Sequence, residues 1–218
     1  MNSLAELREA ALVCTACALH ETRTHVVFGE GNPASPLVLV GEGPGEQEDL
    51  SGRPFVGRAG QMLDQALADN GLSRNDVYIC NTVKCRACEI NGTRKVNRPP
   101  TDVEAAACRQ WLFPQLGFLA PKVILCVGAP SARNLIRKDF KITQERGKYF
   151  PCEFARCAIA TLHPAYILRQ NSATNDGGYS LLVGDIGRAW ATAQKLLEKS
   201  DAKPTGVSPA AIEQDSLF

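Results

Sequence analysis

The chain has 218 residues, with 24 Lys and Arg against 23 Asp and Glu, and it contains nine cysteines. This length indicates one compact domain with a tail, or at most two small domains, and the net charge of +1 excludes steering of a partner by overall charge. No apolar run approaches the roughly 18 residues of a membrane span, and the N-terminus lacks a signal-peptide pattern. We therefore expect a cytosolic (cytoplasmic) protein whose cysteines are metal or cluster ligands and core residues, not disulfides.

Four short apolar runs are typical of strands that are buried on both faces of a parallel sheet. In chain order they cover residues 37–41, 77–82, 122–128 and 157–162, and helical spacing recurs over about 57–70, 101–119, 130–138 and 179–199. This alternation predicts an α/β fold, a three-layer α/β/α sandwich with a central four-stranded parallel sheet. We expect one domain over residues 1–200, followed by a flexible tail over 201–218.

Three of the predicted strands end in polar or glycine-rich residues. The stretch 41–49 (GEGPGEQED) follows the first strand, Asn81 ends the second, and His163 follows the fourth. The carboxyl ends of parallel strands meet in the crevice where ligands bind. The sequence therefore predicts that these tips converge on one pocket.

The cysteines include two pairs whose two-residue spacing suits a metal site. Cys14 and Cys17 form the first pair, Cys85 and Cys88 form the second, and Cys108 lies in a predicted helix. Four thiolates hold either a tetrahedral zinc ion or an iron–sulfur cluster. Spacing alone leaves a zinc site made of the two pairs as a serious alternative.

Taken together, the motifs resemble those of the iron–sulfur uracil-DNA glycosylases, family four of the uracil-DNA glycosylase superfamily. The matching stretches are CTAC, GEGPGEQEDLSGRPFVGRAGQML, DVYICNTVKCR, VILCVGAPSA, RGKYF and HPAYILR, which cover nearly all of residues 14–170. The resemblance implies a four-stranded parallel sheet between helices, hydrolytic excision of uracil from DNA that leaves an abasic site, and a [4Fe–4S] cluster. The cluster ligands that it implies are Cys14, Cys17, Cys85 and Cys108, so that Cys108 displaces Cys88.

Three residues are expected to recognise a uracil that has been flipped out of the base stack. Phe55 is expected to stack on the flipped ring. Asn81 is expected to accept a hydrogen bond from uracil N3–H and to donate one to O4, a pattern that cytosine reverses. His163 is expected to donate a hydrogen bond to uracil O2 as negative charge develops on the leaving base, for which a neutral imidazole suffices.

Carboxylates and glycines after the first strand complete the expected site. Glu42 is the first candidate to position the attacking water and Glu48 the second, while Asp49 is a further candidate contact to the substrate on the same loop. Gly41 and Gly43 allow the main chain to approach the base closely.

The segment between Cys85 and Cys108 is longer than is usual in family four. It resembles the loop of a related branch that stays covalently attached to its abasic product through a histidine. Asn97 stands at the position of that histidine, and because an amide is a poor nucleophile, we expect turnover. The expected DNA contacts are Arg86, Arg94, Lys95, Asn97, Arg98, Tyr166 and Arg169, with Arg146 and Lys148 as further candidates for phosphate contacts.

Two alternative functions and one further partner follow from the remaining features. A protein that binds uracil-containing or abasic DNA with slow or single turnover is the main alternative, and a redox protein is another. The chain ends in Gln214-Asp215-Ser216-Leu217-Phe218, which resembles the pentapeptide by which bacterial replication and repair proteins bind the sliding clamp. We expect a monomer that acts on double- or single-stranded DNA and has no membrane partner.

Overall fold

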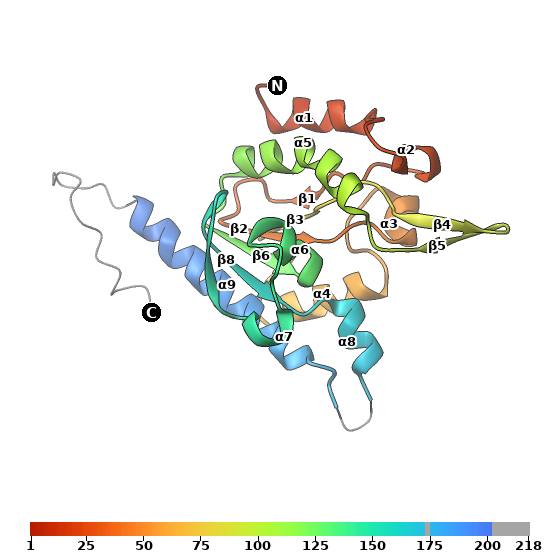
Figure 1. The fold of residues 1–218 in the computed structure, drawn as a ribbon. Coiled ribbons are helices and arrows are strands. Elements are labelled where there is room, and N and C mark those ends of the chain that lie inside the picture. The colour runs from red at the N-terminus through yellow and green to blue at the C-terminus, as the bar shows by residue number, and fades with distance from the viewer. Residues whose placement is uncertain (173–174, 202–218) are drawn as a thin grey trace.

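The computed structural model describes residues 1–172 and 175–201 (Figure 1). Its centre is a six-stranded sheet in the order β1-β3-β2-β6-β8-β7. The four inner strands run parallel to one another; they are β3 (Tyr78–Asn81), β2 (Leu37–Gly41), β6 (Val123–Val127) and β8 (Ala155–Thr161). The predicted parallel strands are therefore confirmed as the centre of a larger sheet.

Two antiparallel strands that the sequence prediction lacks extend the sheet at its edges. β1 (Glu30–Gly31) pairs with β3, and β7 (Tyr149–Cys152) pairs with β8. Both strands are short and contain exposed residues, so they lack the continuous apolar run by which a buried strand is recognised. The sheet is therefore mixed, and only its inner part matches the prediction of a purely parallel sheet.

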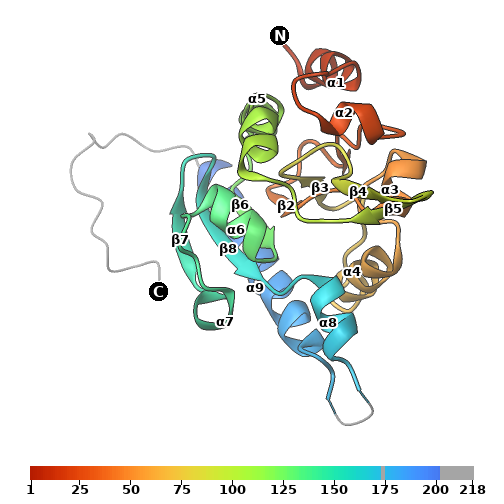
Figure 2. The same ribbon diagram turned by 45° about the vertical axis from the view of Figure 1, so that its right-hand side comes forward.

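Helices cover both faces of the sheet and form the expected three layers (Figure 2). One face carries α4 (Arg58–Ala68), α8 (Pro164–Gln170) and α9 (Tyr179–Asp201), and the other carries α5 (Asp102–Leu119) and α6 (Ala129–Leu135). Alternate side chains of each inner strand enter the two apolar layers, as the pleat of a strand requires. This double burial explains why the inner strands read as continuous apolar runs.

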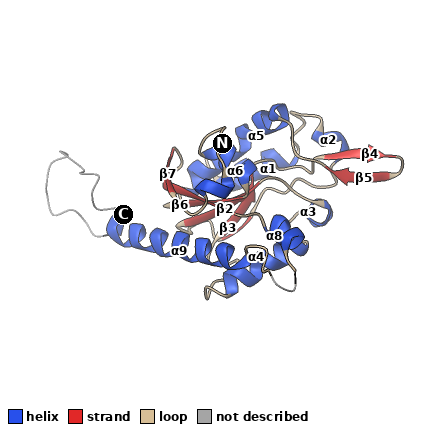
Figure 3. Cartoon of the chain, turned by 60° about the horizontal axis from the view of Figure 1, so that its bottom comes forward, coloured by secondary structure: helices blue, strands red, loops and turns tan. Residues whose placement is uncertain are grey.

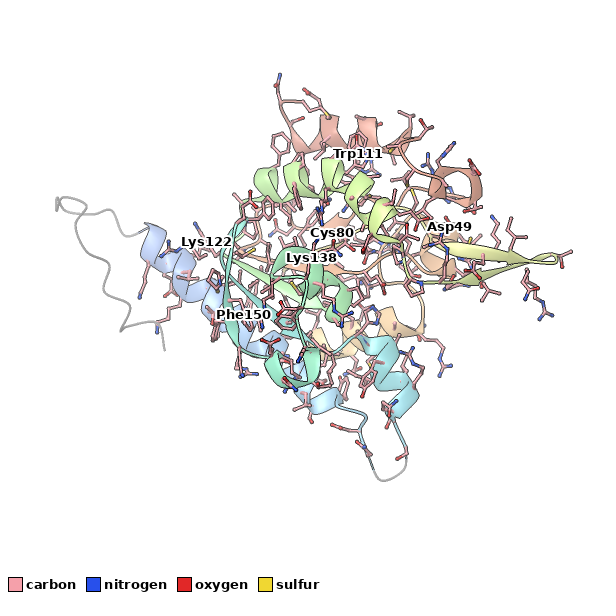
Figure 4. The ribbon with its side chains drawn as sticks, in the orientation of Figure 1. Asp49, Cys80, Trp111, Lys122, Lys138 and Phe150 are labelled. Carbon is pink, nitrogen blue, oxygen red and sulfur yellow. The ribbon has the colours of Figure 1, made fainter. Side chains whose placement is uncertain are left out.

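Several short elements surround this sandwich. They are α1 (Leu4–Leu12), α2 (Leu19–Thr22), α3 (Glu46–Ser51), α7 (Ile142–Glu145), and a separate hairpin of β4 (Cys88–Asn91) and β5 (Arg94–Asn97). The hairpin projects away from the sheet (Figure 3). The helix α1 packs against α5, and Trp111 of α5 lies between the two helices (Figure 4).

Two segments expected to be loops, and a third for which no element was predicted, are in fact regular structure. The stretch after β2 contains α3, the stretch after His163 is α8, and the extended segment after Cys85 contains the β4–β5 hairpin. Short helices and exposed hairpins bury too few side chains to show an apolar period. Glu48 and Asp49 are therefore helical residues, and Tyr166 and Arg169 lie on a helix.

The ends of the described chain bear on two further predictions. None of the helices in residues 1–172 and 175–201 has the length and apolar character that a membrane crossing needs. The helix α9 runs to Asp201, and the segment from Gln214 to Phe218, which resembles a clamp-binding pentapeptide, lies outside the described residues.

Candidate active site and cysteine cavity

A cavity of about 340 Å³ lies at the carboxyl ends of β2, β3 and β8. Its volume is at the lower end of the range for small-molecule sites. The predicted site residues that line it are Glu42, Gly43, Glu48, Phe55, Asn81, Asn97, Arg98 and His163. The expected convergence of the strand tips on one pocket is thus present in the structure.

Asn81 places a buried side-chain amide at the cavity. It is the last residue of β3, is 1% exposed, and pairs in register with Gly41 of β2. Its amide oxygen makes no hydrogen bond within the described part of the chain. Because an unsatisfied buried acceptor costs about 1–3 kcal/mol, the position of this oxygen at the cavity is best explained by a ligand that donates to it.

Phe55 contributes a ring that is held in an unusual main-chain conformation. It is 5% exposed, and its φ of 52° lies in the left-handed region that residues other than glycine rarely adopt. The Arg74 guanidinium donates to the carbonyl of Pro54 at 2.9 Å and to that of Phe55. Arg74 is not among the residues expected at the site, since nothing in the surrounding sequence distinguishes it from an ordinary surface arginine.

Two glycines make room for Phe55. A Cβ atom on Gly41 would lie 2.5 Å from Cζ of the Phe55 ring and would also collide with the Asn81 amide. A Cβ atom on Gly60 of α4 would collide with the Phe55 carbonyl. Gly41 therefore acts beside the cavity, where the absence of its side chain lets the ring and the amide approach each other.

His163 is positioned as a neutral hydrogen-bond donor. It is the N-cap of α8, and its Nδ1 accepts a hydrogen bond from the main-chain N–H of Ala165 at 3.1 Å. This bond places the imidazole proton on Nε2. Burial, with the positive charge of Arg169 adding to it, lowers the pKa of His163 to about 4. The ring therefore stays neutral near pH 7, and its centroid is 5.8 Å from that of Phe55.

The two candidate catalytic carboxylates differ in what they contact. Burial raises the pKa of Glu42, and no hydrogen bond or charged neighbour among the described residues adds to that shift. Glu48 instead accepts hydrogen bonds from the main-chain N–H groups of Val56 and Gly57, both at 2.8 Å, and of Gly45 at 3.1 Å. Glu42 is therefore available to a water, whereas Glu48 joins α3 to the loop that carries Phe55.

Asp49 does not line the cavity, although the sequence analysis places it in the substrate site. Its carboxylate is 1% exposed and accepts hydrogen bonds from the main-chain N–H groups of Thr24 at 2.8 Å and His25 at 3.4 Å. In Figure 4 it is labelled on α3, beside the start of the projecting hairpin. Asp49 therefore holds α3 to the segment before β1, and we remove it from the expected substrate contacts.

Arg86 is also placed differently from the expectation that it faces DNA. Its side chain is 5% exposed; it donates to Asn97 Oδ1 at 2.6 Å and to the Lys95 carbonyl at 3.0 Å, and it pairs with Glu46 at 3.4 Å. A guanidinium that is used in this way has little capacity left for a phosphate. The structure thus assigns Arg86 to fastening the β4–β5 hairpin beside the cavity.

The other expected DNA contacts differ in how firmly partners within the protein hold their side chains. Arg98 forms an ion pair with Glu104 at 2.6 Å, and this bond lowers the pKa of Glu104 to about 2. Lys95 donates to the Thr22 carbonyl at 2.6 Å, and Arg146 pairs with Asp185 at 3.1 Å. Exposed side chains remain at Arg94, Lys148, Tyr166 and Arg169.

A second, smaller cavity of about 20 Å³ lies under the segment that joins α1 and α2. Cys14, Cys17, Cys85 and Cys108 all line it, whereas Cys88 starts the hairpin and does not. The tertiary structure therefore brings together the four cysteines that the resemblance selects, and not the four that the spacing of the two pairs selects.

Hydrogen-bond donors point at three of the four sulfurs. Trp111 Nε1 lies 3.0 Å from Sγ of Cys14, the main-chain N–H of Lys84 lies 3.2 Å from Sγ of Cys108, and Arg23 lies 3.5 Å from Sγ of Cys85. Within residues 1–172 and 175–201, no three Cys, His, Asp or Glu side chains gather closely enough to share one metal ion. The four sulfurs thus surround a common space without meeting at a single point.

Comparisons with known proteins relate this arrangement to a family. Residues 28–183 match the sequence profile of the uracil DNA glycosylase superfamily. The type-4 uracil-DNA glycosylase of Thermotoga maritima is 47% identical over 160 residues, which is 73% of this chain and 80% of that protein. Those of Archaeoglobus fulgidus and Pyrobaculum aerophilum are 41% and 39% identical over 77% of this chain and over 84% and 85% of their own lengths.

Proposed function

Because the chain belongs to the type-4 uracil-DNA glycosylases, which hydrolyse the N-glycosidic bond and so remove uracil from DNA, we propose that the larger cavity receives the flipped uracil. The observation that carries this proposal is the buried amide oxygen of Asn81, which accepts no hydrogen bond from the described residues and lies in the same cavity as Phe55 and His163. An acceptor, an aromatic face and a neutral donor are the groups that a pyrimidine with N3–H and O2 requires.

Phe55 and Asn81 make different contributions to the recognition of uracil. The Phe55 ring supplies stacking, which is worth about 1–3 kcal/mol for any base. The Asn81 oxygen accepts uracil N3–H, and its amide N–H donates to O4. Cytosine presents an acceptor at N3 and a donor at C4, so it leaves both ends of the buried amide mismatched, and this mismatch provides the selectivity.

His163 and Glu42 act on the bond that breaks. As the N-glycosidic bond lengthens, electrons move onto the base, and His163 Nε2–H stabilises the charge at O2 without giving up its proton. The sugar becomes positive, and the Glu42 carboxylate orients the water that attacks its anomeric carbon and accepts a proton from that water. The products are free uracil and an abasic site. Asn97 is held by Arg86, which supports turnover rather than covalent capture of the product.

The exposed residues around the cavity provide the proposed contacts with DNA. Arg94 lies on the projecting hairpin, while Tyr166 and Arg169 lie on α8, the helix that His163 caps. Groups on two sides of the cavity suit a duplex that is held while one nucleotide enters it. Arg98 lines the cavity as well, and although it is paired with Glu104 its side chain is 24% exposed, against 5% for Arg86, so it is the candidate contact for the phosphate next to the flipped base.

The four cysteines of the smaller cavity are proposed to hold a [4Fe–4S] cluster. Cys14, Cys17, Cys85 and Cys108 would hold the cluster, because all four line this one cavity and thiolates are the usual ligands of such clusters. The donors to three sulfurs, and the positive charge of Arg23, are the surroundings that stabilise bound thiolates. The cluster has a structural role in this proposal, because it joins the N-terminal segment to the stretch after β3 and to α5.

A base-release assay tests the proposed pocket. The full chain is incubated with oligonucleotides that carry uracil opposite guanine, opposite adenine or in a single strand, and product is followed past one equivalent of enzyme. We expect multiple turnovers, and we expect Asn81→Ala to lose about 10- to 100-fold in kcat/KM, because it removes two directed hydrogen bonds. Asn91→Ala, on the exposed hairpin, is the control. A plateau at one equivalent supports the DNA-binding alternative instead.

A further inference from the structure

Lys84 is the most unusual buried residue between the two cavities. It is 1% exposed, its side chain is among the largest that the structure buries completely, and it lines the cysteine cavity. Burying an ammonium group is unfavourable unless hydrogen bonds and an opposite charge compensate for the lost water. The surroundings of Lys84 therefore need an explanation.

Lys84 contacts both sites directly. Its Nζ donates to the main-chain carbonyl of Asn81 at 2.8 Å, and its own main-chain N–H donates to Sγ of Cys108 at 3.2 Å. Nζ also donates to Gln115 Oε1 at 2.5 Å and lies 5.6 Å from the centre of the Phe28 ring. One residue thus spans the distance between a proposed cluster ligand and the residue that recognises uracil.

The hydrogen-bond partners of this ammonium are all neutral. Both acceptors of Nζ are carbonyl oxygens, and none of the ion pairs formed by residues 1–172 and 175–201 includes Lys84. A cluster that is bound by four thiolates has a net negative charge, and the cavity that would hold it is the one that Lys84 lines. A cluster held in this cavity would therefore supply the opposite charge that the burial of Lys84 requires.

We propose that Lys84 is a positioning residue that couples the cysteine-held cluster to the recognition of uracil. The negative charge of the cluster keeps the ammonium buried, and the ammonium holds the main chain of Asn81 so that its side-chain amide faces the base. The inference rests on the proposed roles of Asn81 and of the four cysteines. It adds that cluster binding and uracil recognition depend on the same side chain.

The test is a double-mutant cycle on the full chain with its cluster. Lys84→Met keeps most of the side-chain volume and removes the charge and both hydrogen bonds, and it is combined with Asn81→Ala. Lys138→Met is the control, since Lys138 is exposed on the segment after α6 (Figure 4). Two quantities are measured for each variant: kcat/KM for uracil excision, and the rate at which an iron chelator bleaches the visible absorbance of the cluster.

The two readouts separate coupling from a general loss of stability. We expect Lys84→Met to lower kcat/KM by about 10- to 100-fold in the wild-type background, as the loss of a charge-assisted hydrogen bond would do, and by less than about 3-fold when Asn81 is already alanine. We also expect faster bleaching than in the wild type or in the Lys138 variant. An equal loss in both backgrounds, or unchanged bleaching, overturns the proposal.

Two controls keep the proposal distinct from the function on which it rests. If Lys84→Met does not yield folded protein, the same cycle is run with Lys84→Gln, which keeps a donor near the Asn81 carbonyl without the charge, and equal losses in both backgrounds again overturn the coupling. A wild-type protein without the visible absorbance of a cluster refutes the proposed role of the four cysteines, and an Asn81→Ala variant with full activity refutes the proposed role of Asn81; either result removes the coupling as well.

Discussion

Replacing Arg74 with methionine tests whether the strained conformation of Phe55 is needed for catalysis. Arg74 donates to the carbonyls of Pro54 and Phe55 and forms ion pairs with Glu30 at 2.8 Å and Asp64 at 2.6 Å. The left-handed conformation of Phe55 costs about 1–3 kcal/mol. Without the guanidinium, the loop is free to relax, and the ring then leaves its place against Gly41.

The size of the effect follows from what the ring contributes. Base stacking is worth about 1–3 kcal/mol, which corresponds to about 5- to 150-fold in kcat/KM. Because stacking acts on the bound base before and during bond cleavage, we expect a rise in KM with a smaller change in kcat. The loss in Phe55→Ala sets the upper limit, since Arg74 is expected to act only through the position of that ring.

The assay compares steady-state excision of uracil by Arg74→Met, Phe55→Ala and Arg53→Met. Arg53 is a matched control, because it pairs with the same Glu30 at 2.8 Å but its side chain is 60% exposed, and an exposed ion pair contributes little. We expect less than about a 2-fold change for Arg53→Met. Equal effects of the two arginine substitutions, or a larger loss for Arg74→Met than for Phe55→Ala, would refute this reasoning.

Three further predictions concern Glu42, His163 and the cysteines. Glu42→Gln should lower single-turnover excision by about 10²- to 10⁴-fold with little change in affinity for uracil-containing DNA, and an unchanged rate contradicts its role. Because the pKa of His163 is lowered to about 4, the unfolded imidazole takes up a proton below about pH 6.5 that the folded one does not. The free energy of unfolding should therefore fall from about pH 6.5 towards pH 4, with a steeper slope in the wild type than in His163→Asn; identical slopes in denaturant titrations count against a buried neutral imidazole. Cys108→Ser should lower the iron content of the purified protein and Cys88→Ser should not, and the reverse result restores the ligand set that is based on spacing.

The elements that could be predicted from the sequence are those that depend on the types of neighbouring residues in the chain. The inner strands could be predicted because burial on both faces demands continuous apolar residues. The start of α5 is equally local, since Thr101 and Glu104 form a capping box in which Glu104 accepts from the Thr101 N–H at 2.8 Å. The short edge strands, the hairpin and α3 could not be predicted, since they bury too few apolar side chains to produce a periodic pattern in the sequence.

The candidate site shows a similar division. Asp49 and Arg86 are charged and lie in segments that contribute to the site. However, the Asp49 carboxylate accepts hydrogen bonds from main-chain N–H groups. The Arg86 guanidinium donates to Asn97 and Lys95 and pairs with Glu46. A charged residue next to a motif can bind a ligand or hold the motif in place, and only its partners distinguish the two. Lys84 was missed although a lysine between a buried strand and a cysteine is a usable signal.

By itself, the sequence determined the class of fold, the family, and the strand ends at which the base must bind, because apolar runs and motif spacing are local properties of the chain. Only the tertiary structure decided which of five cysteines face one cavity, which of two glutamates is free for a water, and that Lys84 spans both sites. Those outcomes depend on contacts between residues far apart in the chain, such as Lys84 with Gln115 and Arg74 with Glu30. No local sequence pattern encodes such contacts, because the partners of a side chain depend on which distant segments the fold places beside it.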